Sequence, residues 1–158
     1  MDLGLLVLAR ALHILAGITW TGATLITAFA LVPVLIGQTT QSPWFAAISR
    51  RIGPMAMITS VVTVVTGIYL FVVLHAHDTT TGGIVLTTGA LMGLIAVPSG
   101  IMIGRTVSTR EAHLTGASGD AAQIAAARAK LRMHARISTV LQVLSVLAMA
   151  TFRYASAL

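Results

Sequence analysis

His13 and Trp20 lie seven residues apart in a stretch that carries no charged residue from Ala11 to Pro33. On a helix of 3.6 residues per turn they share one face with Arg10. An imidazole, an indole and a guanidinium on one stripe suit a metal centre or a cofactor with acidic groups. Ionisable side chains inside a membrane helix are costly and usually face the interior of a bundle. This stripe is therefore the candidate site.

The composition excludes an ordinary soluble domain. Of the 158 residues, 56% are hydrophobic and only 9% are charged, whereas charged residues make up about a quarter of a typical soluble protein. Cysteine is absent, so any metal or haem must use histidine, methionine or oxygen ligands. The net charge of +6 comes from arginines that flank apolar runs, which indicates membrane topology and argues against a nucleic-acid partner.

Hydropathy predicts one domain over residues 1–158, an all-α integral membrane bundle of four helices in antiparallel, up-down order. The first apolar run is long enough to cross a bilayer, which takes about 20 residues. A polar stretch, residues 105–136, should form a cytoplasmic extension between the third and fourth helices. Its alanine-rich part should begin after the N-cap Asp120 and continue straight into the fourth span. The predicted spans are approximately 11–36, 54–74, 84–103 and 137–152.

Several local features refine this plan. Pro33 should bend or end the first span, and residues 44–51 should form a short helix in the membrane interface after Ser42 and Pro43. Residues 75–83 are long enough only for an antiparallel turn. The third span carries two pairs of glycines at a spacing that favours close helix packing, Gly89 with Gly93 and Gly100 with Gly104.

The distribution of positive charge predicts the orientation. Two cationic residues lie between the first and second spans and six between the third and fourth, which makes eight of the ten in the chain. The positive-inside rule therefore places both loops in the cytoplasm. Both termini and the 75–83 turn would lie outside, in a multi-pass protein of the plasma or inner membrane.

This orientation gathers three histidines and two arginines at the outer end of the bundle. His13 is the predicted haem ligand, because a neutral imidazole is the usual axial ligand and a four-helix bundle offers an apolar slot. His75 is the expected sixth ligand, with His77 as the alternative two residues further into the turn. Arg10 and Arg153 would pair with the propionates, and Trp20 would pack or hydrogen-bond beside the cofactor.

Each of these residues also has a structural interpretation. His13 could be a hydrogen-bonded histidine that only holds the bundle together, and His75 could complement the C-terminal dipole of its helix. Arg10 and Arg153 could be interface anchors that reach the headgroups.

The run Ala11-Leu12-His13-Ile14, with Trp20 and Gly22 further on, resembles the first helix of CopD-like (copper-resistance protein D) membrane proteins. It is more distantly similar to the HemJ-type membrane protoporphyrinogen oxidases, and the runs 51–54 and 65–70 have a similar character. The HemJ resemblance implies that His13 ligates haem b. That family also relies on a lysine within a span, whereas the only lysine here is Lys130, in the polar stretch. The CopD resemblance implies handling of copper or of a redox centre.

The sequence thus predicts a membrane b-type haem protein that serves electron transfer, redox chemistry or haem handling, with a quinone or another redox protein as partner. Whether it is an enzyme stays open; if so, it would be a haem-dependent oxidoreductase. The chain could also form a homo-oligomer. One alternative is a copper-binding or copper-transport protein, and another is a membrane scaffold subunit. The copper alternative would use a second group of ligands toward the cytoplasmic side: Met55, Met57, Met102, Met133, His113 and His134.

Overall fold

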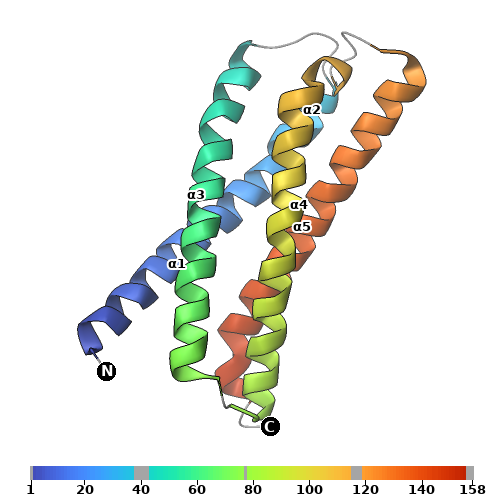
Figure 1. Ribbon diagram of the computed structural model, residues 1–158. Coiled ribbons are helices and arrows are strands. Elements are labelled where there is room, and N and C mark those ends of the chain that lie inside the picture. Colours follow the sequence, from blue (N-terminus) through green and yellow to red (C-terminus); the bar gives the residue numbers. More distant parts are fainter. Residues whose placement is uncertain (1, 38–42, 77, 115–118, 156–158) are drawn as a thin grey trace.

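The computed structural model describes residues 2–37, 43–76, 78–114 and 119–155 (Figure 1). This part of the chain is helical, and it confirms the predicted all-α bundle of four long helices. The first of them is continuous through α1, the π-helical turn η1 and α2. The elements in order are α1 (Leu3–Ile26), η1 (Thr27–Leu31), α2 (Val32–Gly37), α3 (Pro43–Leu74), α4 (Thr81–Leu114) and α5 (Ala121–Ala155).

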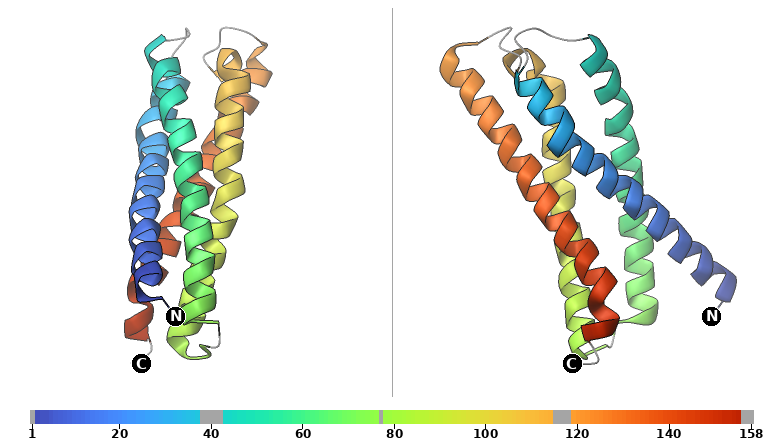
Figure 2. Two further views of the ribbon diagram at one scale, coloured as in Figure 1. Left: turned by 60° about the vertical axis from the view of Figure 1, so that its left-hand side comes forward. Right: turned by 180° about the vertical axis from the view of Figure 1, so that it is seen from behind.

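The helices run alternately up and down, so the bundle has two distinct ends (Figures 1 and 2). The start of α1, the end of α5, the end of α3 and the start of α4 lie at one end, called here the terminal end. The other end, where α2 leads to α3 and α4 leads to α5, carries Arg50, Arg51, Arg128 and Arg132 and is called the arginine-rich end.

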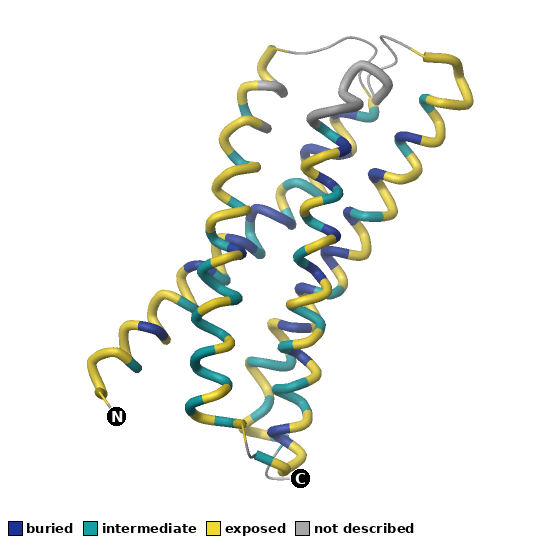
Figure 3. The backbone as a smooth tube through the Cα atoms, viewed as in Figure 1, coloured by how far each residue is buried: buried dark blue, intermediate teal, exposed yellow. Residues whose placement is uncertain are grey.

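All four long helices are long and apolar enough to cross a membrane, so the chain has the build of a multi-pass membrane protein. Only 11% to 28% of the residues in the most apolar part of each are buried inside the chain. The exposed large hydrophobic side chains are mostly leucine, isoleucine and valine. Figure 3 shows exposed positions, in yellow, along all four long helices. Leu15 and Ile18 of α1, 66% and 67% exposed, are examples that only a lipid environment would suit.

The four helices associate as two close pairs, α1 with α3 and α4 with α5, and contacts between the pairs are far fewer. Glycine sets the distance within the second pair. A Cβ on Gly89 would lie 2.6 Å from the Cβ of Ala148, and one on Gly93 would lie 3.1 Å from the Ser145 hydroxyl. The first glycine pair therefore packs against α5 as expected. Gly100 and Gly104 do not, because a Cβ on either would meet nothing within 4 Å.

The apolar core lies in the arginine-rich half, where both pairs meet. Leu35 and Leu131 are fully buried there, and small residues of α5 let the helices approach. Its buried members are Leu31, Val32, Leu35, Ile103, Ala127, Leu131 and Ala135.

The structure differs from the predictions at two places between the first two spans. Pro33 does not end the helix: the backbone N–H of Val32 bonds to the carbonyl of Thr27, and the helix continues to Gly37. This wider turn gives room for a ring that would clash with the preceding turn of a regular helix. Residues 44–51 do not form a separate interface helix, because α3 begins at Pro43 and runs through Pro54 to Leu74. Ser42 lies outside the described residues.

The helical part of the prediction for the polar stretch is confirmed. The Asp120 carboxylate accepts a hydrogen bond from the backbone N–H of Gln123 at 2.7 Å, which caps the start of α5. The helix then runs without a break for 35 residues, from the polar segment into the apolar span. The rest of the polar segment is helical as far as Leu114, because α4 extends beyond its apolar part.

Candidate functional site: a cavity between the helix pairs

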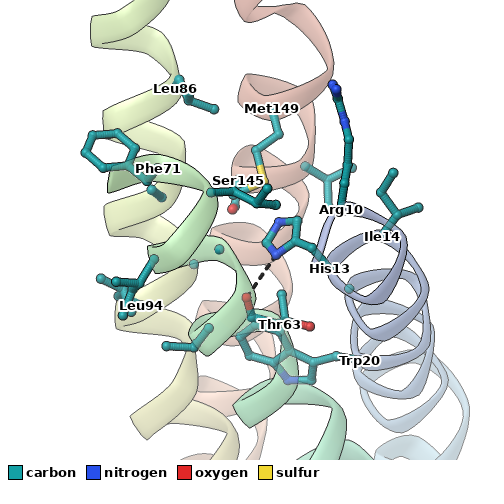
Figure 4. Close-up of a pocket in the computed structure, with 18 of the residues that line it drawn as sticks. Arg10, His13, Ile14, Trp20, Thr63, Phe71, Leu86, Leu94, Ser145 and Met149 are labelled. Atoms are coloured by element: carbon teal, nitrogen blue, oxygen red, sulfur yellow. Dashed lines mark hydrogen bonds between the residues drawn. The ribbon is translucent and has the colours of Figure 1, made fainter. Parts of the chain in front are cut away.

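A cavity of about 340 Å³ lies between the two helix pairs in the terminal half (Figure 4). All four long helices contribute to its wall, and this volume falls within the range of small-molecule sites. Apolar side chains form most of the lining: Ile14, Val64, Ile68, Leu70, Phe71, Leu74, Leu86, Leu94, Val146, Met149 and Phe152. The polar or ionisable side chains are Arg10, His13, Trp20, Thr21, Thr63, His75, Gln142 and Ser145.

His13 reaches from α1 to α3, where its Nδ1 lies 2.9 Å from the backbone carbonyl oxygen of Thr63. A carbonyl oxygen only accepts hydrogen bonds, so Nδ1 carries the proton and donates. The Thr66 hydroxyl, 3.3 Å from Nδ1, is itself committed as a donor to the carbonyl of Val62 at 2.6 Å. Among the described residues Nε2 has no hydrogen-bond partner. With Nδ1 donating, the neutral form of the ring carries its lone pair on Nε2.

Gly67 makes room for this arrangement. A Cβ at this position would lie 2.8 Å from Cε1 and 3.2 Å from Nδ1 of His13. The imidazole therefore rests directly against the α3 backbone. This contact fixes the position of the ring, and the hydrogen bond to Thr63 fixes its tautomer. A histidine that ligates a metal usually has its other ring nitrogen held in this way by a carbonyl or a carboxylate.

His75 lies at the mouth of the cavity, just after the last residue of α3. Its ring meets the Phe152 ring edge-on, with 5.4 Å between the ring centroids. Its Nδ1 lies 3.6 Å from the Asp78 carboxylate. Hydrogen bonds from the hydroxyl and backbone N–H of Thr80 hold the pKa of Asp78 below its usual value, so this carboxylate stays ionised at neutral pH.

The structure brings Arg10, His13, Trp20 and His75 to the wall of one cavity. Arg10, His13 and Trp20 follow one another along one side of α1 (Figure 4). Trp20 is 7% exposed and lies deepest of the three, well inside the bundle. His75 follows Gly67, the neighbour of the His13 ring, by eight residues, which corresponds to about 12 Å along a helix axis. The two imidazoles therefore approach the cavity from different depths.

Arg153 is not part of the lining. Its guanidinium carbon lies 6.0 Å from the centre of the Phe152 ring, which itself lines the cavity mouth. His77, the alternative ligand, lies outside the described residues.

Three residues of this site were not predicted from the sequence: Thr63, Gly67 and Gln142. The carbonyl of Thr63 carries no sequence signal, because any residue has one. Gly67 and Gln142 do carry a signal, since a glycine inside a helix and an amide inside a span both need a reason.

Among the described residues, no group of three or more histidines, cysteines, aspartates or glutamates is arranged to hold a metal ion. No protein-family model, characterised protein or solved structure matches the chain. Fold and site together define a four-helix, multi-pass membrane protein with one oriented histidine facing an intramembrane cavity.

Proposed function

We propose that this protein binds haem b in the terminal-end cavity, with His13 as an iron ligand. One observation carries the proposal: the Thr63 carbonyl holds the Nδ1 proton of His13 and leaves the Nε2 lone pair free in an apolar cavity. This is the state in which imidazole ligates iron. A bound haem would supply one-electron transfer at its iron.

The same geometry favours haem over copper as the ligand. A copper ion needs several protein ligands, and among the described residues no three or more histidines, cysteines, aspartates or glutamates come together around His13. A porphyrin brings four nitrogen donors of its own, so one imidazole from the protein is sufficient. The apolar side chains of the lining suit the macrocycle, and Arg10 at the mouth suits an acidic edge.

The chain's own residues would perform three tasks. His13 would hold the cofactor and set its electron density through the hydrogen bond to Thr63. The apolar lining would exclude water. Arg10 would offset negative charge at the mouth. His75 is proposed as a second iron ligand, which requires its ring to leave Asp78 and turn toward His13. Arg153, beside Phe152, is proposed to add positive charge at the same end.

The distribution of cationic residues supports a topology in which the terminal end lies outside the cytoplasm. Reporter fusions to the C-terminus that behaved as cytoplasmic would contradict this topology.

The absorption spectrum of detergent-purified protein tests the haem proposal. We expect a Soret band with sharp reduced α and β bands in the wild type, and almost none in His13→Ala. His134→Ala is the matched control, because that half-buried histidine lies in the arginine-rich half, and it should retain full haem. Absence of a Soret band from wild-type protein expressed with ample haem would refute the proposal. An equal loss of haem in His134→Ala would place the haem in the arginine-rich half and refute the proposed site.

The spin state tests the second ligand. If His75 ligates the same iron as His13, His75→Ala should convert a six-coordinate, low-spin spectrum to a five-coordinate, high-spin one. A wild-type spectrum that is already high-spin, or a His75→Ala protein that stays low-spin, would exclude His75 as an iron ligand. His75 would then only line the mouth of the cavity. Asp78→Asn is the matched control, since it alters the partner of His75 without removing the imidazole.

A further inference from the structure

Gln142 is a second unusual residue of the cavity, and the haem proposal does not use it. It lies within the apolar part of α5 and is only 2% exposed. In the part of the chain that the structure describes, neither its amide nitrogen nor its amide oxygen has a hydrogen-bond partner. Yet the residue lines the cavity, so its amide group borders open space.

A buried amide without a partner is costly, and the cost is greatest inside a membrane, where no bulk water can reach it. No side chain of the described residues meets this need. Ser138 and Thr139, one turn earlier on α5, are themselves buried without a hydrogen-bond partner, and the polar groups of α3 are used locally. The hydroxyls of Thr59, Thr63 and Thr66 on α3, for example, each donate to a carbonyl of the preceding turn. The partner of Gln142 is therefore expected in the cavity itself.

The chemistry of the amide restricts what that partner is. An anionic group would need a cation beside it, and the cationic residue of the lining, Arg10, lies on α1 one turn before His13, toward the mouth. A pure hydrocarbon would leave both amide atoms unpaired. The amide is neutral, and it donates through its nitrogen and accepts through its oxygen. It thus matches an oxygen that accepts in one state and donates in another, as the carbonyl of a quinone and the hydroxyl of its quinol do.

We propose that this cavity binds the head group of a lipid-soluble quinone or quinol, with Gln142 as the residue that hydrogen-bonds its ring oxygen. Leu94 and Val146 offer apolar walls near the amide for the ring. The few contacts between the two helix pairs leave a route for an isoprenoid tail into the bilayer. This proposal goes beyond the haem proposal and does not depend on it, because the amide lacks a partner whether or not His13 ligates iron.

Trp20 offers a direct probe, because it lines the same cavity and is one of two tryptophans in the chain. The other, Trp44, is 57% exposed on α3 at the arginine-rich end, so Trp44→Phe leaves Trp20 as the only fluorophore. Decylubiquinone is titrated into this protein in phospholipid nanodiscs, using fractions without Soret absorbance, because haem in the same cavity would compete with the quinone and quench Trp20. We expect saturable quenching beyond the collisional quenching by quinone dissolved in lipid.

Gln142→Leu in the same background should weaken the quinone affinity at least tenfold. The matched control is Gln123→Leu, which removes an exposed amide from the same helix outside the cavity and should leave the affinity unchanged. Quenching that never saturates in the wild type, or equal affinity in Gln142→Leu, would overturn the proposal. Haem content is read from the absorbance of the same proteins before the haem-free fractions are taken, so the failure of one proposal is distinguishable from the failure of the other.

Thermal stability separates a ligand-binding role from a structural one. If Gln142 serves a ligand, Gln142→Leu should raise the Tm of quinone-free protein, because leucine removes an unpaired amide from the interior. Added decylubiquinone should then raise the Tm of the wild type but not that of the variant. A lower Tm of the quinone-free variant would show that the amide holds the bundle together, and that result would overturn the proposal.

Discussion

The two halves of the bundle differ in packing: one contains an apolar core and the other contains a cavity. In the arginine-rich half all four long helices contribute to a closed apolar core, and Leu35 and Leu131 within it are fully buried. In the terminal half the helix pairs separate around a cavity whose wall carries a histidine, an arginine and an unpaired glutamine. One half thus holds the helices together, and the other leaves space that packing alone would have filled.

The difference indicates where stability and function lie. A cavity and an unpaired amide both cost stability, so the terminal half is maintained at the expense of its own packing. The long continuous α5 joins the halves: Leu131 lies in its first part, and Gln142 and Ser145 in its second. Substitutions in the two parts of this one helix should therefore have different consequences.

The largest effect is expected in the core. Leu131→Ala removes a fully buried side chain from α5 and should lower the free energy of unfolding by about 2–4 kcal/mol. Unfolding by denaturant in detergent measures this, and haem bound per folded protein should be unchanged. Leu147→Ala, on an exposed face of α5, is the control and should change the stability little. A similar loss from both would mean that the core is not the main stabilising region.

A smaller effect is expected at the contact between His13 and α3. Gly67→Ala places a methyl group against the imidazole, which must move away from the Thr63 carbonyl. Loss of such a supporting hydrogen bond typically weakens metal binding about 10- to 100-fold. Haem titration followed at the Soret band measures the affinity.

Gly53→Ala is the matched control for this glycine. It lies on the same helix, and an added Cβ there would meet nothing within 4 Å. It should bind haem like the wild type. If Gly67→Ala also bound haem normally, the contact with Thr63 would not be what orients His13.

The sequence was sufficient to predict the fold because lipid imposes simple rules. Long apolar runs, the antiparallel turn after Leu74 and the Asp120 cap each follow from local chemistry. The differences at Pro33 and at residues 44–51 have a common cause. Proline does not end a helix in either place: the first helix continues past Pro33 after a π-helical turn, and α3 continues through Arg50, Arg51 and Pro54.

The site was less predictable because it depends on pairing between helices. Helical periodicity was enough to place Arg10, His13 and Trp20 on one stripe of α1. It was not enough to show which helix that stripe faces. Only the three-dimensional arrangement brings the Thr63 carbonyl to His13, or leaves the amide of Gln142 beside open space.

The smallest effect is expected at the mouth of the cavity. Arg10→Gln removes a positive charge that lines the cavity one helical turn before His13, while leaving the ligand in place. If the haem propionates lie near it, the cation favours the more electron-rich ferrous state. Its loss should then lower the reduction potential by roughly tens of millivolts, because the charge is exposed and partly screened. Redox titration at the reduced α band measures the potential, and Arg153→Gln, outside the cavity lining, should shift it less. An unchanged or raised potential in Arg10→Gln would place the acidic edge of the cofactor elsewhere, with the polar residues of α5 as the next region to test.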